Sequence, residues 1–208
     1  PHMLPNEEEW GKIVSDLGIK NSDHVVIYDN SDIISSCRCW YSFIYFGHNI
    51  DKVSVLDGGL TKWINEKKST TNKIKKFNKT EYAVAENKSL VKNKEQIKKN
   101  IISKQFELVD ARSEQRFKGL VPEPRKGLKS GHIKNSKNIP FNECLNKNDR
   151  TFKNKEELIK IFEKQNIDNK NVVFTCGSGV TACVLGLVNS IISGKTPIIY
   201  DGSWSEWG

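Results

Sequence analysis

Short apolar runs alternate along this chain with segments in which apolar residues recur at helical spacing. Runs rich in β-branched and aromatic residues predict buried strands at 25–29, 53–56, 106–109, 172–175 and 197–200. Helical spacing of apolar residues predicts helices at 35–47, 94–104, 154–165 and 182–188. Because strands and helices alternate, we expect an α/β fold in which helices flank parallel central sheets.

One helix is expected to be amphipathic, and one polar segment is expected to be a linker. The helix at 94–104 is expected to bury one face, formed by Ile97, Ile101 and Ile102. The stretch 67–88 is polar and rich in Lys, Asn, Ser and Thr, which is typical of a linker.

Cys176 directly follows the strand expected at 172–175, and the loop Gly177-Ser178-Gly179 leads from it into the next helix. A Cys at such a corner meets the N–H groups and positive dipole of a helix N-terminus, and both favour the thiolate. Most free cysteines are inert packing, but a following Gly-x-Gly lets loop amides turn toward the sulfur and indicates a nucleophile. Parallel strands share a carboxyl edge, so Asp110 and Asp201 are expected beside it.

The charge balance bears on possible partners. The 208 residues carry a net charge of +8, but the Lys residues are scattered through Asn- and Lys-rich stretches without a nucleic-acid motif. We interpret this charge as solvated surface that attracts small anionic substrates. No apolar run reaches membrane-spanning length, so we expect neither a nucleic acid nor a membrane as partner.

Cysteine usage points to a reducing compartment. The five cysteines, Cys37, Cys39, Cys144, Cys176 and Cys183, are odd in number and include no Cys-x-x-Cys pair. The four His residues are scattered, so no metal site is expected. Free thiols suit a cytoplasmic or mitochondrial location.

Two segments recur at nearly equal separations. Residues 25–29 match 172–176 (176 − 29 = 147), and residues 55–63 match 199–207 (207 − 63 = 144). Such offsets predict a duplicated domain. Coincidence between generic strands is the alternative, and the shared Asp-Gly-to-Trp spacing argues against it.

The duplication predicts unequal halves. Asp29 stands where the other half has Cys176, and a carboxylate repels anions, so the first copy is predicted to be inactive. The start of that copy would fall before residue 1, so we expect it to lack its opening strand. The expected domains are a partial copy at 1–66, a linker at 67–88 and a catalytic domain at 89–208.

Several motifs point together to one family. They are Cys176-Gly177-Ser178-Gly179-Val180-Thr181-Ala182, Asp110-Ala111-Arg112 with Arg116-Phe117, Pro122-Glu123-Pro124-Arg125, Gly131-His132-Ile133, Asn138-Ile139-Pro140-Phe141 and Asp201-Gly202-Ser203-Trp204. As a set they resemble the rhodanese superfamily, specifically the tandem-domain 3-mercaptopyruvate sulfurtransferases. The resemblance spans nearly the whole chain.

The resemblance implies a reaction. In that family the active-site Cys carries sulfur as a persulfide, so Cys176 would take sulfur from 3-mercaptopyruvate and release pyruvate. The sulfur would pass to a thiol such as thioredoxin, or to cyanide, without a cofactor or metal. Amides of the loop would hold the negative charge of the persulfide, and they belong to Gly177, Ser178, Gly179, Val180 and Thr181.

Substrate recognition is also implied by the resemblance. Arg116 and Arg125 match two family arginines that bind the substrate carboxylate and carbonyl, a task that suits the forked guanidinium. Without the resemblance, both would be interpreted as solvated surface residues. Relatives that prefer thiosulfate place two basic residues after the Cys, whereas Gly177 and Ser178 are neutral, which favours mercaptopyruvate.

The resemblance further implies a proton relay. Ser178 would pass a proton to the leaving enolate, although a loop-stabilising hydroxyl is an equal alternative. The family pairs this Ser with a His and an Asp from the first domain. His2 lies in a segment that matches the one carrying the His, although Pro1-His2-Met3 also fits a cloning scar. The Asp has no match in this chain, so we expect the relay to be incomplete.

Three other functions compete with this one. Cysteine-dependent phosphatases use a similar loop but need an Arg where this chain has Ala182, which argues against phosphate chemistry. A non-catalytic rhodanese-like binding module is the second alternative, and Cys176, Arg116 and Arg125 together argue against it. A thiosulfate:cyanide sulfurtransferase is the nearest enzymatic alternative.

Overall fold

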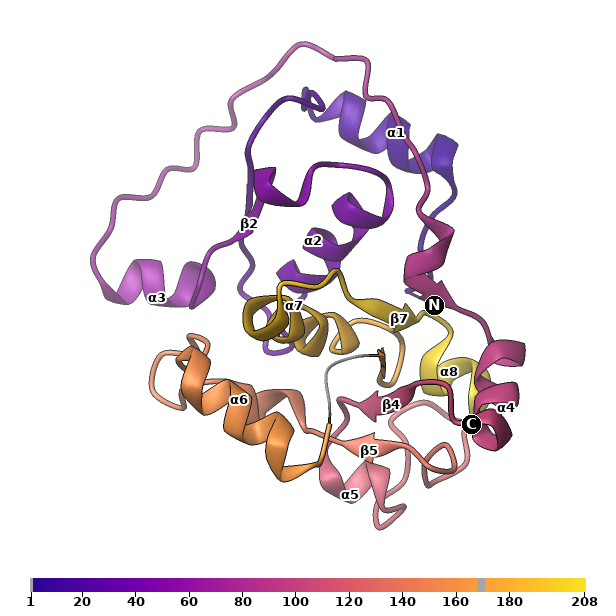
Figure 1. The fold of residues 1–208 in the computed structure, drawn as a ribbon. Helices are drawn as coiled ribbons and strands as arrows, with labels where there is room; N and C mark the ends of the chain where they lie inside the picture. The colour runs from indigo at the N-terminus through magenta and orange to yellow at the C-terminus, as the bar shows by residue number, and fades with distance from the viewer. Residues whose placement is uncertain (1, 168–170) are drawn as a thin grey trace. The chain divides into compact units, whose positions relative to one another are not determined.

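The computed structural model describes residues 2–167 and 171–208, and the chain divides into two compact units (Figure 1). Unit 1 comprises Pro1–Met3, Ser89–Asn146 and Phe152–Gly208. Unit 2 comprises Leu4–Lys88 and Lys147–Thr151.

Unit 1 is built on a five-stranded parallel sheet. Its strands, in spatial order, are β3 (Val91–Lys92), β7 (Ile198–Tyr200), β6 (Val172–Thr175), β4 (Glu107–Asp110) and β5 (Lys137–Asn138). The central strand β6 lies between β7 and β4 and is buried along its whole length. A strand covered on both faces reads as a continuous apolar run, which is why residues 172–175 were recognisable from sequence.

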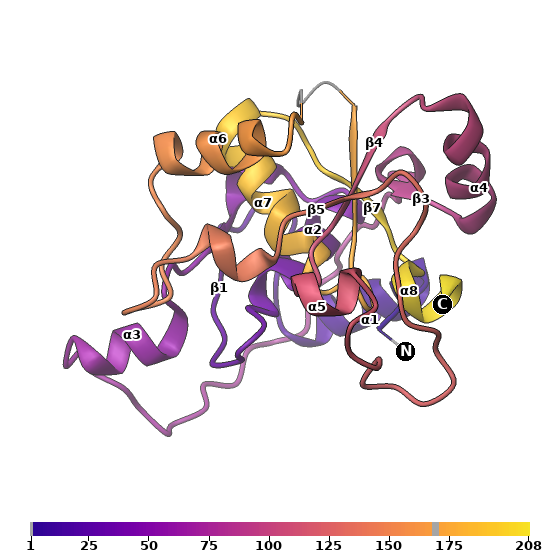
Figure 2. The same cartoon turned by 90° about the horizontal axis from the view of Figure 1, so that it is seen from below.

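Helices cover both faces of this sheet (Figure 2). On one face, α4 (Lys94–Ser103) and α8 (Ser203–Trp207) pack over Leu108, Val173 and Tyr200. On the other, α6 (Lys155–Lys164) and α7 (Ala182–Ser193) pack over the residues that alternate with these, and the ring of Phe162 meets that of Phe174 edge-on at 6.3 Å. The remaining elements of this unit are short: α5 (Glu114–Phe117), η3 (Phe141–Cys144) and η2 (Lys88–Leu90), which begins at the boundary between the units.

Unit 2 contains a two-stranded parallel sheet, β1 (Val25–Ile27) and β2 (Val53–Val55). Its helices are α1 (Glu7–Asp16), α2 (Ser36–Tyr45), η1 (Ile50–Lys52) and α3 (Gly59–Asn65). The apolar face of α2 forms the centre of this unit, and Phe46 stacks on Trp10 of α1 at 5.0 Å.

The internal repeat is visible in the strand register. Val26 pairs with Ser54 in unit 2, and Val173 pairs with Ile198 in unit 1, so the two pairs differ by the same offsets of 147 and 144 found in the sequence. A backbone hydrogen bond repeats as well: Leu60 N donates to Asp29 O at 2.9 Å, and Trp204 N donates to Cys176 O at 2.9 Å. The same strand-to-turn geometry is therefore built twice.

Parallel sheets flanked by helices are confirmed, and two local details differ from expectation. Ile102 is 87% exposed, whereas Ile97 is 1% exposed and Ile101 packs beside it. Ile102 follows Ile101 directly, and one residue turns the helix away from the buried face, so the prediction for Ile102 was wrong. Helix α1 was not expected, although Asn6 and Glu9 form a capping box that is readable from sequence.

The segment expected to be a linker, 67–88, has no helix or strand before η2, within the part of the chain that the structure describes. It belongs to unit 2, and its second half is hydrogen-bonded to the rest of that unit. Thr80 N donates to Ser15 O at 3.1 Å and Ala85 N to Phe46 O at 3.1 Å. Tyr82 is buried there beside His48, and burial raises the pKa of Tyr82 to about 12.

Across residues 2–167 and 171–208, every helix falls short of the length and apolar character that crossing a bilayer would require.

Burial on α4 gives a direct test of this packing. Ile97→Ala should lower the free energy of unfolding by about 3 kcal/mol, because it removes apolar atoms from a closed core. Ile102→Ala, five residues later and exposed, should change it by less than about 0.5 kcal/mol. Urea denaturation followed by circular dichroism measures both, and equal effects would contradict the assigned helix face.

Candidate active site

Cys176 lies at the carboxyl edge of the sheet, directly after β6, and its residue is 2% exposed. Asp110 ends β4 and pairs in register with Thr175, and Asp201 follows β7, so the expected shared edge is confirmed. From Cys176 the chain runs through residues 177–181 into α7, with Thr181 as the N-cap. All of the candidate site described below belongs to unit 1.

The turn after β7 fixes the main chain on both sides of the sulfur. Cys176 N donates to Ser203 Oγ at 3.2 Å, and Ser203 Oγ donates to Tyr200 O at 2.8 Å. Trp204 N donates to Cys176 O at 2.9 Å. Ser203 is fully buried with φ of 50°, a left-handed conformation that few residues other than Gly adopt. Sequence reasoning assigned no role to Ser203.

The loop amides are available to an anion. Within residues 2–167 and 171–208, the N–H groups of Gly177, Ser178, Val180 and Thr181 donate to no protein oxygen. Val180 is buried, and the other three are half-buried. Since buried N–H groups need an acceptor, four such donors beside one thiol form a site suited to negative charge.

Gly177 and Gly179 have different roles in this loop. A Cβ on Gly177 would lie 3.0 Å from Nη2 of Arg116, so Gly allows the guanidinium to approach the loop. Gly179 has φ of 79°, which favours Gly over other residues. Its carbonyl accepts a hydrogen bond from Cys183 Sγ at 3.2 Å, so Cys183 supports the loop from the first turn of α7.

Arg116 is held by a buried ion-pair network. Its Nη2 lies 2.6 Å from Oε2 of Glu123, and Oε1 of the same carboxylate lies 2.9 Å from Nη1 of Arg112. Arg112 in turn pairs with Asp110 at 2.7 Å and lies over the ring of Trp204 at 4.2 Å. The side chains of Asp110, Arg112 and Glu123 are almost fully buried, while Arg116 keeps 27% exposure.

Arg125 is linked to the loop through Ser205 and His2. Its Nη1 donates to Ser205 Oγ, and its Nη2 lies 3.2 Å from Nδ1 of His2. The same His2 nitrogen lies 2.9 Å from Ser178 Oγ, and Ser205 Oγ donates to Gly177 O at 2.6 Å. The structure therefore brings His2, Ser178 and Arg125 together.

Glu123, Ser203 and Ser205 complete the surroundings but were not among the predicted site residues. Glu123 could have been suspected from sequence, because it stands between two prolines directly before Arg125. Ser205 matches Thr61 in the repeat, so a hydroxyl occurs at this position in both copies. Ser203 could not have been identified from the sequence, since its role depends on a buried left-handed turn that no sequence pattern indicates.

The thiols of two other cysteines, Cys39 and Cys144, lose their protons less readily than an ordinary thiol. Burial raises the pKa of Cys39 to about 11 and that of Cys144 to about 12. All five cysteines are free thiols in the structure. At neutral pH neither Cys39 nor Cys144 competes as a nucleophile.

In unit 2, Asp29 stands at the position that matches Cys176, and neighbouring serines hydrogen-bond its carboxylate. Although burial raises the pKa of Asp29, hydrogen bonds from Ser31, Ser35 and Ser36 lower it below its usual value overall. Ser35 Oγ lies 2.8 Å from the carboxylate. The donors that could bind an anion there already bind Asp29.

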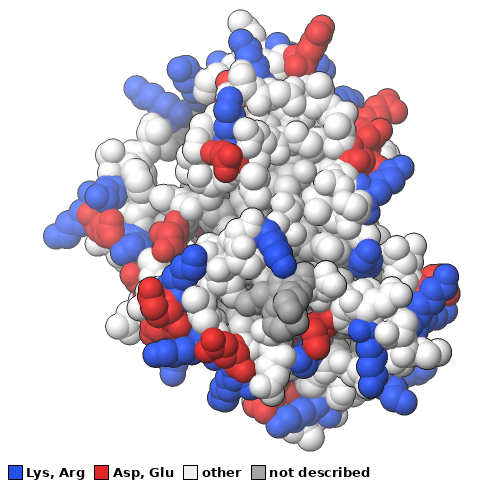
Figure 3. Space-filling view, in the orientation of Figure 1, with Lys and Arg blue, Asp and Glu red and all other residues white. Residues whose placement is uncertain are grey.

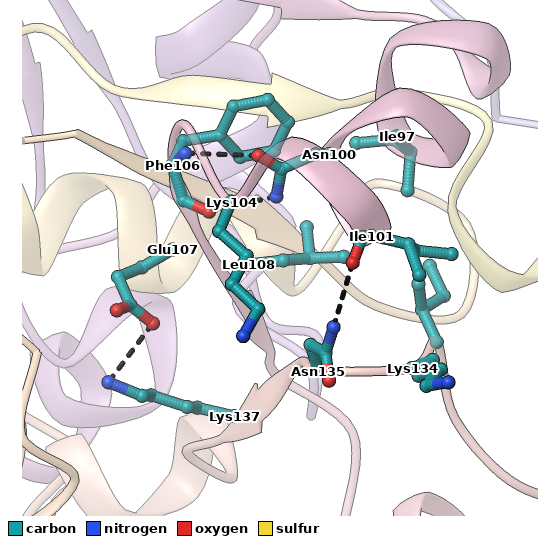
Figure 4. A pocket seen from close by; sticks show the side chains of 11 residues that line it. Ile97, Asn100, Ile101, Lys104, Phe106, Glu107, Leu108, Lys134, Asn135 and Lys137 are labelled. Carbon is teal, nitrogen blue, oxygen red and sulfur yellow. Dashed lines mark hydrogen bonds and ion pairs between the residues drawn. The ribbon is translucent and has the colours of Figure 1, made fainter.

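Metal ligands, surface charge and pockets bear on other possible ligand sites. Within the part of the chain that the structure describes, no group of three or more His, Cys, Asp or Glu residues could hold a metal ion. On the face drawn in Figure 3, Lys and Arg side chains are interspersed with Asp and Glu. A pocket of about 290 Å³ lies between α4 and residues 133–137, at the end of β4 opposite Asp110, and Figure 4 shows Lys104 and Lys137 lining it. It is separate from the Cys176 site.

The ion-pair network can be tested through stability. Glu123→Gln should lower the free energy of unfolding by about 3 kcal/mol, because it leaves the buried guanidinium of Arg112 with one carboxylate instead of two. Glu114→Gln, which breaks an exposed pair with Lys118, is the matched control and should cost less than about 0.5 kcal/mol. Chemical denaturation measures both, and equal losses would contradict the proposed importance of the network.

Comparison with known proteins places the chain in a family. A model of the rhodanese-like domain matches residues 2–66 and 93–208. The chain is 40% identical to Mus musculus 3-mercaptopyruvate sulfurtransferase and 42% identical to Mus musculus thiosulfate sulfurtransferase, in each case over 99% of this chain and 69% of the relative. It is similar to the crystal structure of SseA from Escherichia coli, described as having the rhodanese fold of 3-mercaptopyruvate sulfotransferases, with a TM-score of 0.85 and 30% identity over 99% of this chain and 76% of that one.

The two relatives from one organism carry different substrate names at nearly equal identity, so overall similarity does not select the sulfur donor. Two matched segments, the duplicated strand register and identities near 40% across the chain agree on the wider assignment. This chain belongs to the rhodanese-like family of sulfurtransferases.

Proposed function

We propose that Cys176 carries sulfur from 3-mercaptopyruvate to a thiol acceptor. The single observation that carries this proposal is the set of unpaired loop amides around the only Cys at the sheet edge, among the residues that the structure describes. A loop rich in free donors stabilises an anionic sulfur, both as the attacking thiolate and as the persulfide product.

The first step transfers sulfur to the enzyme. The Cys176 thiolate attacks the sulfur of 3-mercaptopyruvate and forms an S–S bond, while the C–S bond breaks and its electron pair stays on carbon. The product is the enolate of pyruvate, which takes up one proton to become pyruvate. Arg116 and Arg125, which both lie near Gly177, are the proposed partners of the substrate carboxylate and carbonyl.

Ser178 is the proposed source of that proton. Its hydroxyl lies 2.9 Å from Nδ1 of His2, close enough for a proton to be replaced after transfer to the enolate. Arg125 also lies 3.2 Å from Nδ1 and can only donate, so Nδ1 accepts in this arrangement. After Arg125 has turned to the substrate, Nδ1 takes up a proton from water and returns it to Ser178 Oγ. The two residues then act as a short relay without a third member.

The second step returns Cys176 to its starting state. An acceptor thiolate, such as that of thioredoxin, attacks the outer sulfur of the persulfide, and the S–S bond breaks with its electron pair on Cys176. Cyanide can accept the same sulfur atom. Free thiols throughout the chain are compatible with a reducing compartment, the cytoplasm or the mitochondrion.

Thiosulfate is the second candidate donor, favoured by the relatives that carry its name. A dianion would gain from extra positive charge at the loop, but Gly177 and Ser178 supply none. The neutral loop supports mercaptopyruvate as the better substrate.

Loss of the nucleophile is the first test. Cys176→Ser should reduce sulfide release from 3-mercaptopyruvate, measured with excess dithiothreitol, by about 1,000-fold or more. Peptide mass spectrometry of the wild type after one turnover should find the additional sulfur on Cys176. Cys39→Ser, which changes a thiol in unit 2, is the control and should leave the rate unchanged. Sulfide release that survives Cys176→Ser would refute the mechanism.

Charge at the loop is the second test. Wild-type kcat/KM should be higher for 3-mercaptopyruvate than for thiosulfate. Ser178→Lys should raise kcat/KM for thiosulfate itself by about tenfold or more, since it adds a cation beside the bound dianion. Asn171→Lys adds the same charge at the opposite end of β6 and should leave kcat/KM for thiosulfate unchanged. Better wild-type turnover of thiosulfate would remove the substrate assignment alone.

A further inference from the structure

Ser205 joins the Cys176 loop to a substrate-facing arginine. It lies in α8, one turn after β7, and is half-buried. Its main-chain N donates to Gly177 O at 2.8 Å, and its hydroxyl donates to the same oxygen at 2.6 Å. The hydroxyl proton is thereby committed to the loop, which leaves the lone pairs of Oγ for the donor from Arg125.

The two arginines at the site are held in different ways. Arg116 pairs with the carboxylate of Glu123, which compensates its charge. Arg125, among the residues that the structure describes, has no carboxylate within ion-pair distance, and its partners are Ser205 and His2. A neutral hydroxyl holds a guanidinium in place without compensating its charge. Arg125 therefore keeps its full charge for an anionic substrate.

Arg125 needs such a partner because its backbone does little to orient it. It belongs to the segment 119–131, which contains neither helix nor strand. A long side chain on an irregular loop loses conformational entropy when it binds, and a preformed contact reduces that loss. Ser205 is itself fixed by two hydrogen bonds to Gly177. It therefore fixes the position of the Arg125 guanidinium relative to the loop that contains Cys176.

We propose that Ser205 is a positioning residue that directs Arg125 toward the substrate carboxylate and so contributes to the choice of a carboxylate-bearing sulfur donor. The proposal rests on the function proposed above for Arg125. It assigns to Ser205 an effect on substrate binding, with little effect on the sulfur-transfer step itself, because the hydroxyl does not reach the reacting atoms except through Arg125 and Gly177.

The first experiment compares two mercaptoketones. Ser205→Ala should raise KM for 3-mercaptopyruvate about tenfold, the size expected for one lost hydrogen bond to a charged group, and change kcat by less than about threefold. Mercaptoacetone presents the same sulfur and carbonyl without the carboxylate, and its KM should not change. Ser205→Thr, which restores the hydroxyl found at Thr61 in the repeat, should bring KM for 3-mercaptopyruvate back near the wild-type value.

A double-mutant cycle separates positioning from loop damage. On an Arg125→Ala background, Ser205→Ala should raise KM for 3-mercaptopyruvate no further, whereas on an Arg116→Ala background its full effect should remain. Equal effects on both backgrounds, or an equal rise in KM for mercaptoacetone, would overturn the proposal by showing that Ser205 acts on the loop alone.

Binding of pyruvate to the intact chain, measured by calorimetry, makes the outcome independent of turnover. Ser205→Ala and Arg125→Ala should each weaken pyruvate binding, and the double variant should bind no more weakly than Arg125→Ala. If this pattern holds while Cys176→Ser retains sulfide release, the positioning role stands and the proposed function fails. Wild-type protein that binds no pyruvate, or additive losses, would overturn the positioning role.

Discussion

The carboxyl edge of unit 1 depends on one buried arrangement of charges, in which Asp110, Arg112, Glu123 and Arg116 alternate in sign. Two carboxylates and two guanidinium groups sum to zero charge, and their short contacts offset the cost of removing them from water. The network joins the end of β4 to the segment 119–131. Without it, that segment would have few fixed points, because it contains neither helix nor strand.

The same arrangement gives the two arginines at the site unequal character. Arg116 approaches Gly177 but shares its charge with Glu123, whereas Arg125 has a neutral partner in Ser205. The charge of one guanidinium is thus largely compensated, whereas the other guanidinium is held in place by a neutral hydroxyl without compensation of its charge. An anion entering the loop would meet donors from the backbone and a guanidinium whose charge no described carboxylate compensates.

Duplication shows how little of this chemistry belongs to the fold. Both units pair their strands in the same relative register, and in both a backbone N–H from the turn after the second strand donates to a carbonyl just after the first strand. In unit 2 that carbonyl belongs to Asp29, whose carboxylate accepts hydrogen bonds from neighbouring hydroxyl and amide groups. The same backbone therefore carries a thiol in one copy and, in the other, a carboxylate that neighbouring groups already hydrogen-bond.

Sequence alone determined the alternation of strands and helices, the duplication and the corner at Cys176, because these depend on local periodicity and on spacing within one segment. Arg116 and Arg125 were predicted as site residues from family motifs alone, because no local physical signal distinguishes them from surface arginines. Only the tertiary structure decided that Ile102 faces solvent, that Glu123 is shared between two arginines, and that Ser205 links Arg125 to Gly177. Those contacts join segments up to 80 residues apart, and no local pattern encodes which side chains a folded edge will bring together.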